Sequence, residues 1–566
     1  MASSVKGLRL LKAATQNRKT FIMLVFGFSA GLPYTLLLGT LNAWLGEAKV
    51  DLATIGILSW IGLAYAFKFL WSPLVDQLRL PLVSRFGRRR SWLFICQGVL
   101  GLTFITLSFM DPVLAIGAFA LVAVVGAFGS ATQDVVIDAW RIDVADETAK
   151  LEILSSVYQF GYRIAALVGG ALALVLAARI SWPTVYAVMG VLMFVAMIAT
   201  AFAPDTAAAD SKEGEASLRA AGAVEPKLRL GGLAVVGLCW AWAIFTIAAF
   251  MIRVLVADPA DPNPPSAGAF TKTMGPWIVI ATVLVPSIVA AFFNWCKVRG
   301  RNVLAEPLPP ARGASRAADH AYHALILPLA ELIGRLKWGV IVVLALILSY
   351  RFCDNIWGPF AFPFYLEELH YTNDEVAFAS KIFGVLMTMA GIGIGGILFA
   401  TLGRMPTLLI GAATAAASNL LYADLASGSH AIDACIHLFG LTSFGVDVRM
   451  IRLMIAISGE NIAGGLAGAA FVAYLSSIAS KQYSAVQYAL LSSLTFLVGS
   501  LGRAALGESI KIHGYAYVFQ LTAALGLIAV FFCLVEWIRV ARIEARARAQ
   551  ASMAGHPAVA AIGETE

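Results

Sequence analysis

Long apolar runs recur along almost the whole chain, and their lengths predict helices that cross a membrane. A helix needs about 20 mostly apolar residues to span the hydrocarbon core of a bilayer. The runs that satisfy this requirement cover residues 20–45, 52–77, 91–110, 113–140, 153–178, 182–203, 231–256, 276–296, 337–366, 374–400, 405–424, 450–479, 485–505 and 515–537. The pattern therefore predicts an all-α membrane protein with about fourteen transmembrane helices.

Charged residues lie mainly in the connections between these runs, and their signs predict the orientation. Most of the 41 Lys and Arg residues fall in alternate connections or in the two tails, for example at 88–90 and 297–301. The opposite connections are acidic or nearly uncharged. Because cytoplasmic loops are enriched in Lys and Arg, the arginine-rich side and both termini are predicted to be cytoplasmic. The net charge of +7 is therefore a topology signal and does not indicate a nucleic-acid partner.

The composition excludes an ordinary soluble protein, and the sequence lacks the motifs of a membrane enzyme. Sixty per cent of the 566 residues are hydrophobic and 13% are charged, whereas soluble domains contain about 25% charged residues. The six cysteines show no CxxC or Cys/His spacing, so we predict neither disulfides nor a metal site. We find no HExxH motif, no metal-ligand cluster and no nucleophile–base set, so no catalytic residue is predicted.

Charged residues repeat at matching places in two sets of six helices, once the pair at 231–296 is set aside. The second helix of each set carries one lysine, Lys68 or Lys381, and is followed by a glycine–arginine turn. The fourth helix of each set carries acidic residues, and the fifth carries an arginine, Arg163 or Arg503. Two six-helix halves are the plan of major facilitator transporters, so the repeat predicts the major facilitator fold.

The repeat and the polar stretches together give the predicted domain organisation. Residues 204–230 and 297–336 are predicted to be mobile cytoplasmic linkers. The stretch 425–449 is predicted to be an outer, solvated loop, with a partly amphipathic lid as the alternative. The predicted units are an N-terminal six-helix bundle at 1–203, cytoplasmic linkers with two extra transmembrane helices (about 231–256 and 276–296) at 204–336, a C-terminal six-helix bundle at 337–538, and a cytoplasmic tail at 539–566.

Several ionisable side chains fall inside the predicted spans, where a charge facing lipid costs about 3 kcal/mol. They are therefore expected to pair with one another or to line water. Asp134 and Asp138 are four residues apart and project from one face of their helix, where Lys68 and Arg163 can balance them. A carboxylate whose cation partner leaves when a substrate arrives would take up a proton. Asp134 and Asp138 are thus predicted proton carriers, and permanent salt bridges are the alternative.

The second half and the predicted cytoplasmic gate supply further candidates. Asp354 and Glu460, balanced by Arg351 and Lys381, are second choices for proton carriers. At the gate, Asp76 is expected to accept a hydrogen bond from an arginine or from a helix end. The predicted gating residues are Asp76, Arg88, Arg89 and Arg404.

Several motifs in both halves resemble a known family. The most specific is Gln133-Asp-Val-Val-Ile-Asp-Ala-Trp140. The other stretches are 27–33 (GFSAGLP), 68–76 (KFLWSPLVD), 87–90 (GRRR), 161–163 (GYR) and 460–465 (ENIAGG). With these motifs the chain resembles the AmpG-type muropeptide permeases of the major facilitator superfamily. The insertion at 204–336 and the 425–449 stretch are departures from the pattern.

The resemblance implies a function, a location and partners. It implies a proton-coupled importer of anhydromuropeptides, GlcNAc-anhydroMurNAc and its peptides, for cell-wall recycling and β-lactamase induction. It further implies a multi-pass monomer in the bacterial inner membrane, driven by the proton gradient without a cofactor. Such a ligand needs aromatic faces, amide and hydroxyl partners, and cations. The predicted substrate-binding residues are Lys68, Gln133, Tyr158, Tyr162, Arg163, Lys381, Asn461, Gln487 and Ser492.

Other functions remain open from the sequence. A carrier of acetyl-CoA or of another anionic solute in the same superfamily would share part of the motif pattern. A membrane enzyme acting on lipid-linked cell-wall sugars belongs to a different class, and it would form product without transport. A sensor without transport would have to use the cytoplasmic linkers.

Overall fold

The computed structural model describes residues 17–49, 64–65, 67–78, 86–204, 223–256, 267–304, 306, 314–351 and 360–553. Within these ranges eleven helices are long and apolar enough to cross a membrane. The number rises to twelve if the helices Ala318–Leu336 and Gly339–Tyr350, bent by 108°, form one span. The predicted all-α membrane fold is confirmed. The segments 52–77 and 337–366 lie partly outside what is described, so the count of about fourteen stays a prediction.

The N-terminal half comprises the described residues up to 204, and its helices follow the predicted runs within a few residues. These elements are α2 (Arg18–Thr35), η1 (Leu36–Thr40), α3 (Leu41–Glu47), η2 (Lys68–Leu70), α6 (Ser72–Gln77), α7 (Arg88–Ser108), α8 (Ile116–Val144), α9 (Leu151–Ala166), η4 (Leu167–Leu172), α10 (Ala173–Ala177) and α11 (Trp182–Ala201). The inserted segment contributes α13 (Pro226–Val256), α14 (Ala267–Val279), η5 (Ile280–Leu284), α15 (Val285–Val298), α16 (Ala314–Leu325) and α17 (Leu327–Leu336).

The C-terminal half comprises the described residues from 339 onward. Its elements are α18 (Gly339–Tyr350), α20 (Ala361–Pro363), η7 (Phe364–Glu368), α21 (Asn373–Ala377), η8 (Phe378–Phe383), α22 (Gly384–Leu402), α23 (Arg404–Ala426), α24 (His430–Leu438), η9 (Leu441–Phe444), α25 (Val448–Ile478), η10 (Lys481–Tyr483) and α26 (Ser484–Met553). Gly514, with φ of 78°, interrupts α26 and separates it into two helices. The second of these continues past residue 538 to Met553, so part of the predicted tail is helical.

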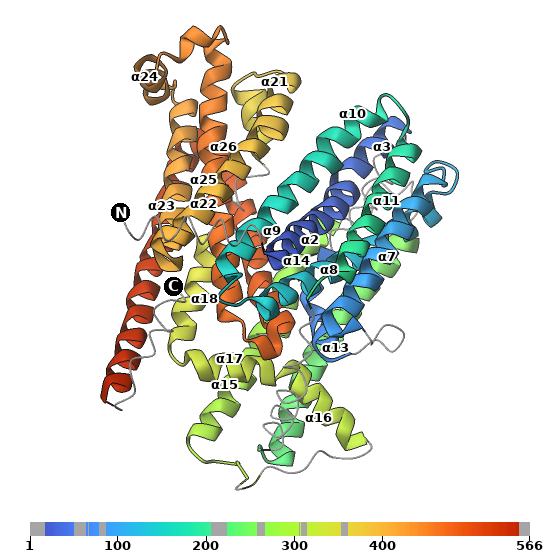
Figure 1. Cartoon of the computed structure of the whole chain (residues 1–566), viewed down its shortest axis with the longest axis vertical. Coiled ribbons are helices and arrows are strands. Elements are labelled where there is room, and N and C mark those ends of the chain that lie inside the picture. Colours follow the sequence, from blue (N-terminus) through green and yellow to red (C-terminus); the bar gives the residue numbers. More distant parts are fainter. Residues whose placement is uncertain are drawn as a thin grey trace.

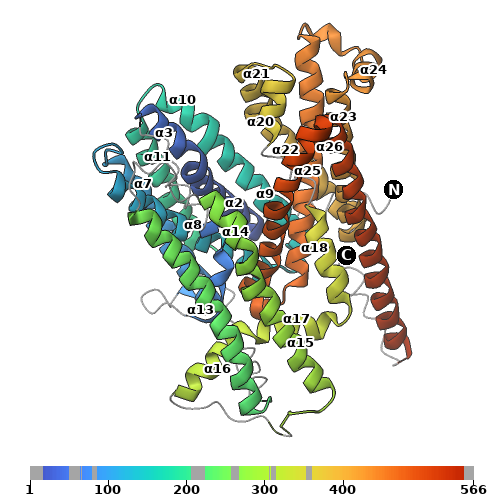
Figure 2. The ribbon, with the colours of Figure 1, turned by 180° about the vertical axis from the view of Figure 1, so that it is seen from behind.

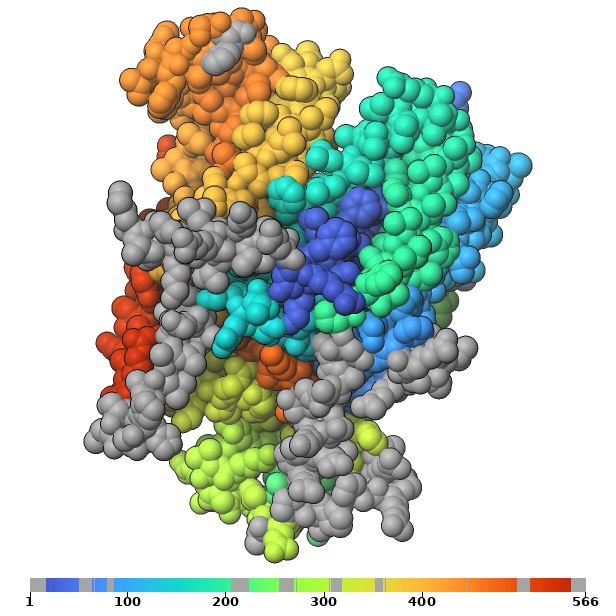
Figure 3. All heavy atoms as spheres, viewed as in Figure 1, coloured from blue at the N-terminus to red at the C-terminus, as the bar shows by residue number. Residues whose placement is uncertain are grey.

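The two halves lie side by side and diverge toward one end (Figure 1). At that end α10 and α24 belong to separate groups of helices, and the space-filling view shows a notch between them (Figure 3). In the opposite direction the halves converge, and α9 packs against α22 and α25. Seen from behind, the inserted helices α13 and α14 run alongside the halves, and α14 packs against α26 (Figure 2). The molecule is therefore open between its halves at one end and closed at the other.

The internal repeat extends to backbone geometry. Gly87 and Gly403 precede the third helix of their halves with φ of 84° and 85°, a region that favours glycine. Each half also has a close helix contact, between the first and fifth helices in the N-terminal half and between the second and fourth in the C-terminal half. A Cβ built on Gly27 would overlap the carbonyl oxygen of Tyr158 in α9, and one on Gly391 would overlap that of Ile462 in α25. The same kind of backbone contact therefore holds a pair of helices together in each half.

Two stretches predicted to lack structure form helices instead. Most of the predicted linker 297–336 is occupied by α16 and α17, and Leu329 and Leu332 of α17 are buried. In the predicted outer loop 425–449, α24 buries Ile432 and Ile436. All three helices are short and amphipathic. They are held in place by packing against the rest of the protein and are too short to cross the membrane. The prediction of an unstructured linker was wrong for α16 and α17. Helix α24 is largely exposed and fits the alternative of a partly amphipathic segment better than a loop.

The close contact at Gly391 yields a stability prediction. Gly391→Ala should lower the stability of the purified protein by about 1–3 kcal/mol, because its Cβ meets backbone that has no room to yield. Gly393→Ala is the matched control, since a Cβ there meets nothing within 4 Å on the same helix. The measurement is the thermal transition of each variant in detergent. Equal transitions for the two variants would contradict the packing described here.

Candidate functional site

A lysine in the N-terminal half lies between the two aspartates of α8. The Nζ atom of Lys68 is 3.5 Å from Oδ2 of Asp134 and 3.9 Å from Oδ2 of Asp138. All three side chains are largely buried. The other carboxylate oxygen of Asp134 is buried and accepts no hydrogen bond from any described residue. The structure thus brings together three residues that the sequence indicated. One carboxylate oxygen of Asp134 is buried and lacks a hydrogen-bond partner among the described residues, which is true of neither oxygen of Asp138.

Asp138 has a second cation partner, Arg141, which lies one residue beyond the predicted span 113–140. Helix α8 extends to Val144, so Arg141 is part of it and is fully buried. Its Nη2 donates to Oδ1 of Asp138 at 2.9 Å and to Oγ of Ser476 in α25 at 3.1 Å. Its guanidinium also lies over the rings of Tyr158 and Tyr488, 5.1 and 5.2 Å from their centroids. Arg141 therefore connects the acidic pair to the C-terminal half.

A cavity of about 280 Å³ lies beside this cluster, between the two halves. Lys68, Tyr158, Tyr162 and Ser492, all predicted substrate-binding residues, are among its lining residues. The whole lining is Tyr65, Lys68, Phe69, Asp138, Tyr158, Gln159, Tyr162, Val472, Tyr488, Ala489, Ser492 and Ser493. The ring of Tyr34 contacts those of Tyr65 and Tyr162, with centroids 5.0 and 6.0 Å away, and enlarges the aromatic wall.

A second cavity of about 280 Å³ adjoins the first and shares Gln159, Val472, Tyr488 and Ser492 with it. Arg163 of α9 and Arg351, which follows α18, both line this second cavity. Arg163 was predicted to balance the aspartates of α8, yet it makes no ion pair with any described residue. Its Nε is buried without a hydrogen-bond partner in the described part of the chain. The cation that completes the acidic cluster is thus Arg141.

Three predicted substrate-binding residues have structural partners in this conformation. Gln133 donates to the carbonyl oxygen of Ser29 at 2.7 Å and so joins α8 to α2. Asn461 bonds Thr388 of α22 at 2.8 Å. Gln487 donates to the carbonyl oxygen of Pro328 and to Glu331, both at 2.7 Å, and so fixes α17. None of the three lines the two cavities.

Two further candidates from the C-terminal half, Glu460 and Lys381, do not line the two cavities. Glu460 accepts a hydrogen bond of 2.6 Å from the hydroxyl of Tyr422, which in turn lies 2.8 Å from that of Tyr365. Lys381 is exposed on η8 and lines neither cavity. Asp354 lies outside the described residues.

Three residues at the site were not predicted from the sequence, and each lies one helical turn from a predicted residue. They are Arg141, Gln159 and Tyr488. Gln159 precedes Tyr162 and Arg163 by three and four residues, and Tyr488 precedes Ser492 by four. Arg141 follows Asp138 by three. Residues three or four apart share a helix face, so this spacing was the available signal. It was not used for Arg141 because the predicted helix ended one residue too early.

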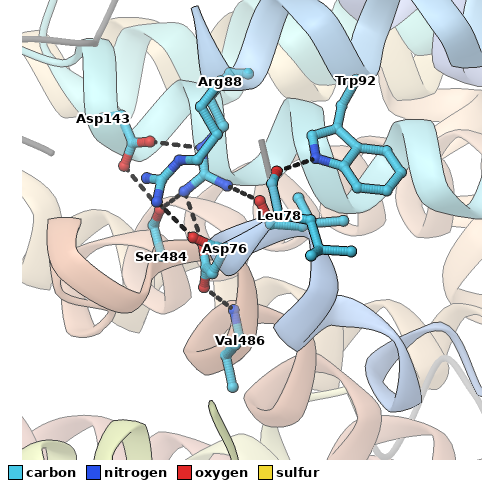
Figure 4. Close-up of polar contacts among 9 residues, drawn as sticks. Asp76, Leu78, Arg88, Trp92, Asp143, Ser484 and Val486 are labelled. Carbon is cyan, nitrogen blue, oxygen red and sulfur yellow. Dashed lines mark hydrogen bonds and ion pairs between the residues drawn. The ribbon is translucent and has the colours of Figure 1, made fainter. Parts of the chain in front are cut away.

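The predicted gating residues lie at the closed end, where both halves contribute (Figure 4). Arg89 is almost fully buried, and its guanidinium donates to Asp143 at 2.8 Å and to Asp76 at 2.7 Å. From the C-terminal half, the Ser484 hydroxyl accepts from Arg89 at 2.9 Å and donates to Asp143 at 2.7 Å. The backbone N–H of Val486 donates to Asp76 at 2.9 Å. This network joins α6, α7 and α8 to the beginning of α26.

The remaining gating candidates lie around this network. Arg88 donates to the carbonyl oxygen of Asp76 at 2.6 Å, within the N-terminal half. Arg404 of α23 lies 3.5 Å from Glu152 of α9, which is a contact between halves. Lys481 donates to the carbonyl oxygen of Ala145 at 3.2 Å, also between halves. Hydrogen bonds and ion pairs therefore close the arginine-rich end of the molecule.

Removing the Ser484 hydroxyl should loosen the closed end. Ser484→Ala deletes hydrogen bonds between the halves but leaves Arg89 paired with two carboxylates, so the halves should separate more often there. Hydrogen bonds to charged groups contribute about 1.5–3 kcal/mol. Faster hydrogen–deuterium exchange is expected in α6 and at the start of α26. Ser477→Ala is the control, because that hydroxyl donates to Tyr474 of its own helix. Unchanged exchange in Ser484→Ala would show that the network does not hold the halves.

Known proteins similar to this chain point to one superfamily. The family model described as Major Facilitator Superfamily matches residues 21–260. An anhydromuropeptide permease of Escherichia coli (strain K12) is 29% identical over 538 residues, which cover 93% of this chain and 82% of that protein. A transporter named AmpG 4 from Rickettsia conorii is 26% identical over 92% of this chain and 96% of its own length.

Solved structures show the same fold. The proton:xylose symporter XylE, bound to 6-bromo-6-deoxy-D-glucose, aligns with a TM-score of 0.53 and 11% identity over 91% of this chain and 94% of its own. The human organic anion transporter MFSD10 aligns with a TM-score of 0.50 and 13% identity over 91% of this chain and 99% of its own. The chain is a multi-span membrane transporter and not an enzyme. Its similarity is to the major facilitator superfamily, whose family model matches residues 21–260, and along most of its length to the AmpG-type permeases.

Proposed function

We propose that the chain imports anhydromuropeptides together with protons, for cell-wall recycling and β-lactamase induction. The E. coli permease that is similar along 93% of the chain carries this substrate in its name. The proposal also places the chain in the bacterial inner membrane as a monomer, with both termini in the cytoplasm. The arginine-rich closed end would then face the cytoplasm, and the open end would admit substrate from outside.

The observation that carries the proposal is the pair of adjoining cavities between the halves. Together they offer tyrosine rings, amide and hydroxyl groups, and cationic side chains, in the region that must open alternately to each side of the membrane. Sugar rings can pack on the faces of Tyr65, Tyr158 and Tyr162. Peptide carboxylates can bind Lys68 or Arg163. An anhydromuropeptide has both kinds of group, so its two parts match the two cavities.

The arrangement around Lys68 suggests how a proton is coupled to the substrate. A substrate carboxylate that binds Lys68 competes with Asp134 for the same ammonium group. Asp134 has no other cation partner among the described residues, so losing Lys68 favours its protonation. Asp138 keeps Arg141 and stays charge-compensated. We therefore assign proton exchange to Asp134 and a supporting role to Asp138, with Glu460 as a second choice.

Alternating access requires the halves to separate at the closed end and to approach each other at the open end. The bonds from Ser484 and Val486 to the Arg89 network must then break. Arg88, Arg89 and Asp76 would remain together in the N-terminal half, so no buried ion pair within it is lost on opening. The network would act as a gate that selects between two states.

Uptake of labelled anhydromuropeptide into membrane vesicles tests the function. Wild type should accumulate the label when a pH gradient is imposed. Asp134→Asn should lose this accumulation but keep exchange of labelled for unlabelled substrate, because the neutral side chain mimics the protonated form. Asp138→Asn should be impaired less.

Asp433→Asn is the control for these variants, because that residue pairs with Arg452 at the far end of the C-terminal half. Full pH-driven accumulation by Asp134→Asn would refute the proton assignment. If wild type takes up no muropeptide but takes up an acyl-CoA, and coenzyme A inhibits that uptake, the result would instead favour a carrier of acyl-CoA.

A further inference from the structure

Two arginines from different halves line the same cavity. Arg163 belongs to α9 in the N-terminal half, and Arg351 follows α18 in the C-terminal half. The described residues that line this cavity include two cations and no carboxylate, whereas the adjoining cavity contains Asp138 beside its lysine.

The Arg163 side chain lacks the partners that a charge at membrane depth requires. It forms no hydrogen bond or ion pair with any described residue, and its Nε is buried. Because an unpaired buried guanidinium is costly, an anion that accepts its hydrogen bonds would be bound firmly. Gln159, one turn earlier on α9, lines the same cavity and adds an amide donor. The cavity therefore presents an unfilled donor of Arg163 together with an amide group to a ligand.

The opposite wall is shaped to leave room for a ligand. Gly464, Gly465 and Gly468 of α25 line the cavity. A Cβ built on Gly468 would lie 3.4 Å from Nη1 of Arg351 and 3.8 Å from Nε2 of Gln159. A Cβ built on Gly464 would meet nothing within 4 Å. Gly464 and Gly468 therefore leave space beside Arg351 and Gln159, whereas Gly465 packs against the backbone of Thr388.

We propose that Arg163 and Arg351 bind one carboxylate of the substrate between them, and that this carboxylate draws the two halves together. Each arginine comes from a different half, so a carboxylate that accepts hydrogen bonds from both links the two halves. The inference rests on the proposed function, because the anion is taken to be a peptide carboxylate of an anhydromuropeptide. Lys68 would then serve proton coupling, and the arginine pair would serve recognition and closure.

The test compares two ligands on the full-length protein in lipid nanodiscs. One is an anhydromuropeptide with free peptide carboxylates, and the other is the same molecule with those carboxylates converted to carboxamides. Equilibrium binding should be at least about tenfold tighter for the acid, since hydrogen bonds to charged groups are strong. Arg351→Gln and Arg163→Gln should lose this preference while retaining binding of the carboxamide. Arg253→Gln, exposed on the inserted helix α13, is the control and should keep the preference.

A second variant guards against misfolding of the arginine mutants. Gly468→Leu fills the space beside Arg351 without removing a charge, and it should also abolish the preference for the acid. Equal affinity of wild type for both ligands, or an unchanged preference in the arginine and glycine variants, would overturn the inference and leave the transport function intact. If wild type binds neither ligand, the proposed function fails, and the inference fails with it.

Discussion

A charge held at membrane depth must meet an opposite charge or water, and this constraint organises the site. Lys68 can lie inside the N-terminal half because Asp134 and Asp138 face it from one side of α8, and Arg141 one turn further compensates Asp138. Arg141 also bonds Ser476 of α25, so the charged chain ends at the interface between the halves. The buried charged side chains therefore lie where the two halves meet. A movement of one half relative to the other changes which of these charges are paired.

The same interface explains why the molecule closes at one end. Arg89 is satisfied by Asp76 and Asp143 from its own half, and Ser484 and Val486 add contacts from the other half through hydrogen bonds alone. Hydrogen bonds across an interface can be exchanged for water when the interface opens, whereas a broken buried ion pair would leave charges unpaired. In the Arg89 network the ion pairs lie inside the N-terminal half and replaceable hydrogen bonds join the halves, which suits a transporter that must open and close repeatedly.

The fold was predictable from the sequence because span length, charge asymmetry and the internal repeat are local signals. The lysine and the two aspartates of the N-terminal half were identified for the same reason, since few charges occur inside the spans. Other site features depend on tertiary contacts. Gln133 and Gln487 are polar and lie in specific motifs, yet they bond to backbone and to α17. Helices α16 and α24 are too short and polar to be recognised by span length. Arg141 was missed because a shift of one turn at a helix end decides whether an arginine is buried.

The central claim is that two halves move about the charged interface, so that one end opens as the other closes. Double electron–electron resonance on spin-labelled protein in nanodiscs measures this directly, after replacement of the native cysteines. One pair of labels belongs at the open end, on the exposed residues Val175 and Leu438, and the other at the closed end, on Leu78 and Trp338. The account predicts two populations, in which shortening at the open end accompanies lengthening at the closed end when substrate and pH are varied. A single fixed distance for each pair under all these conditions would contradict it.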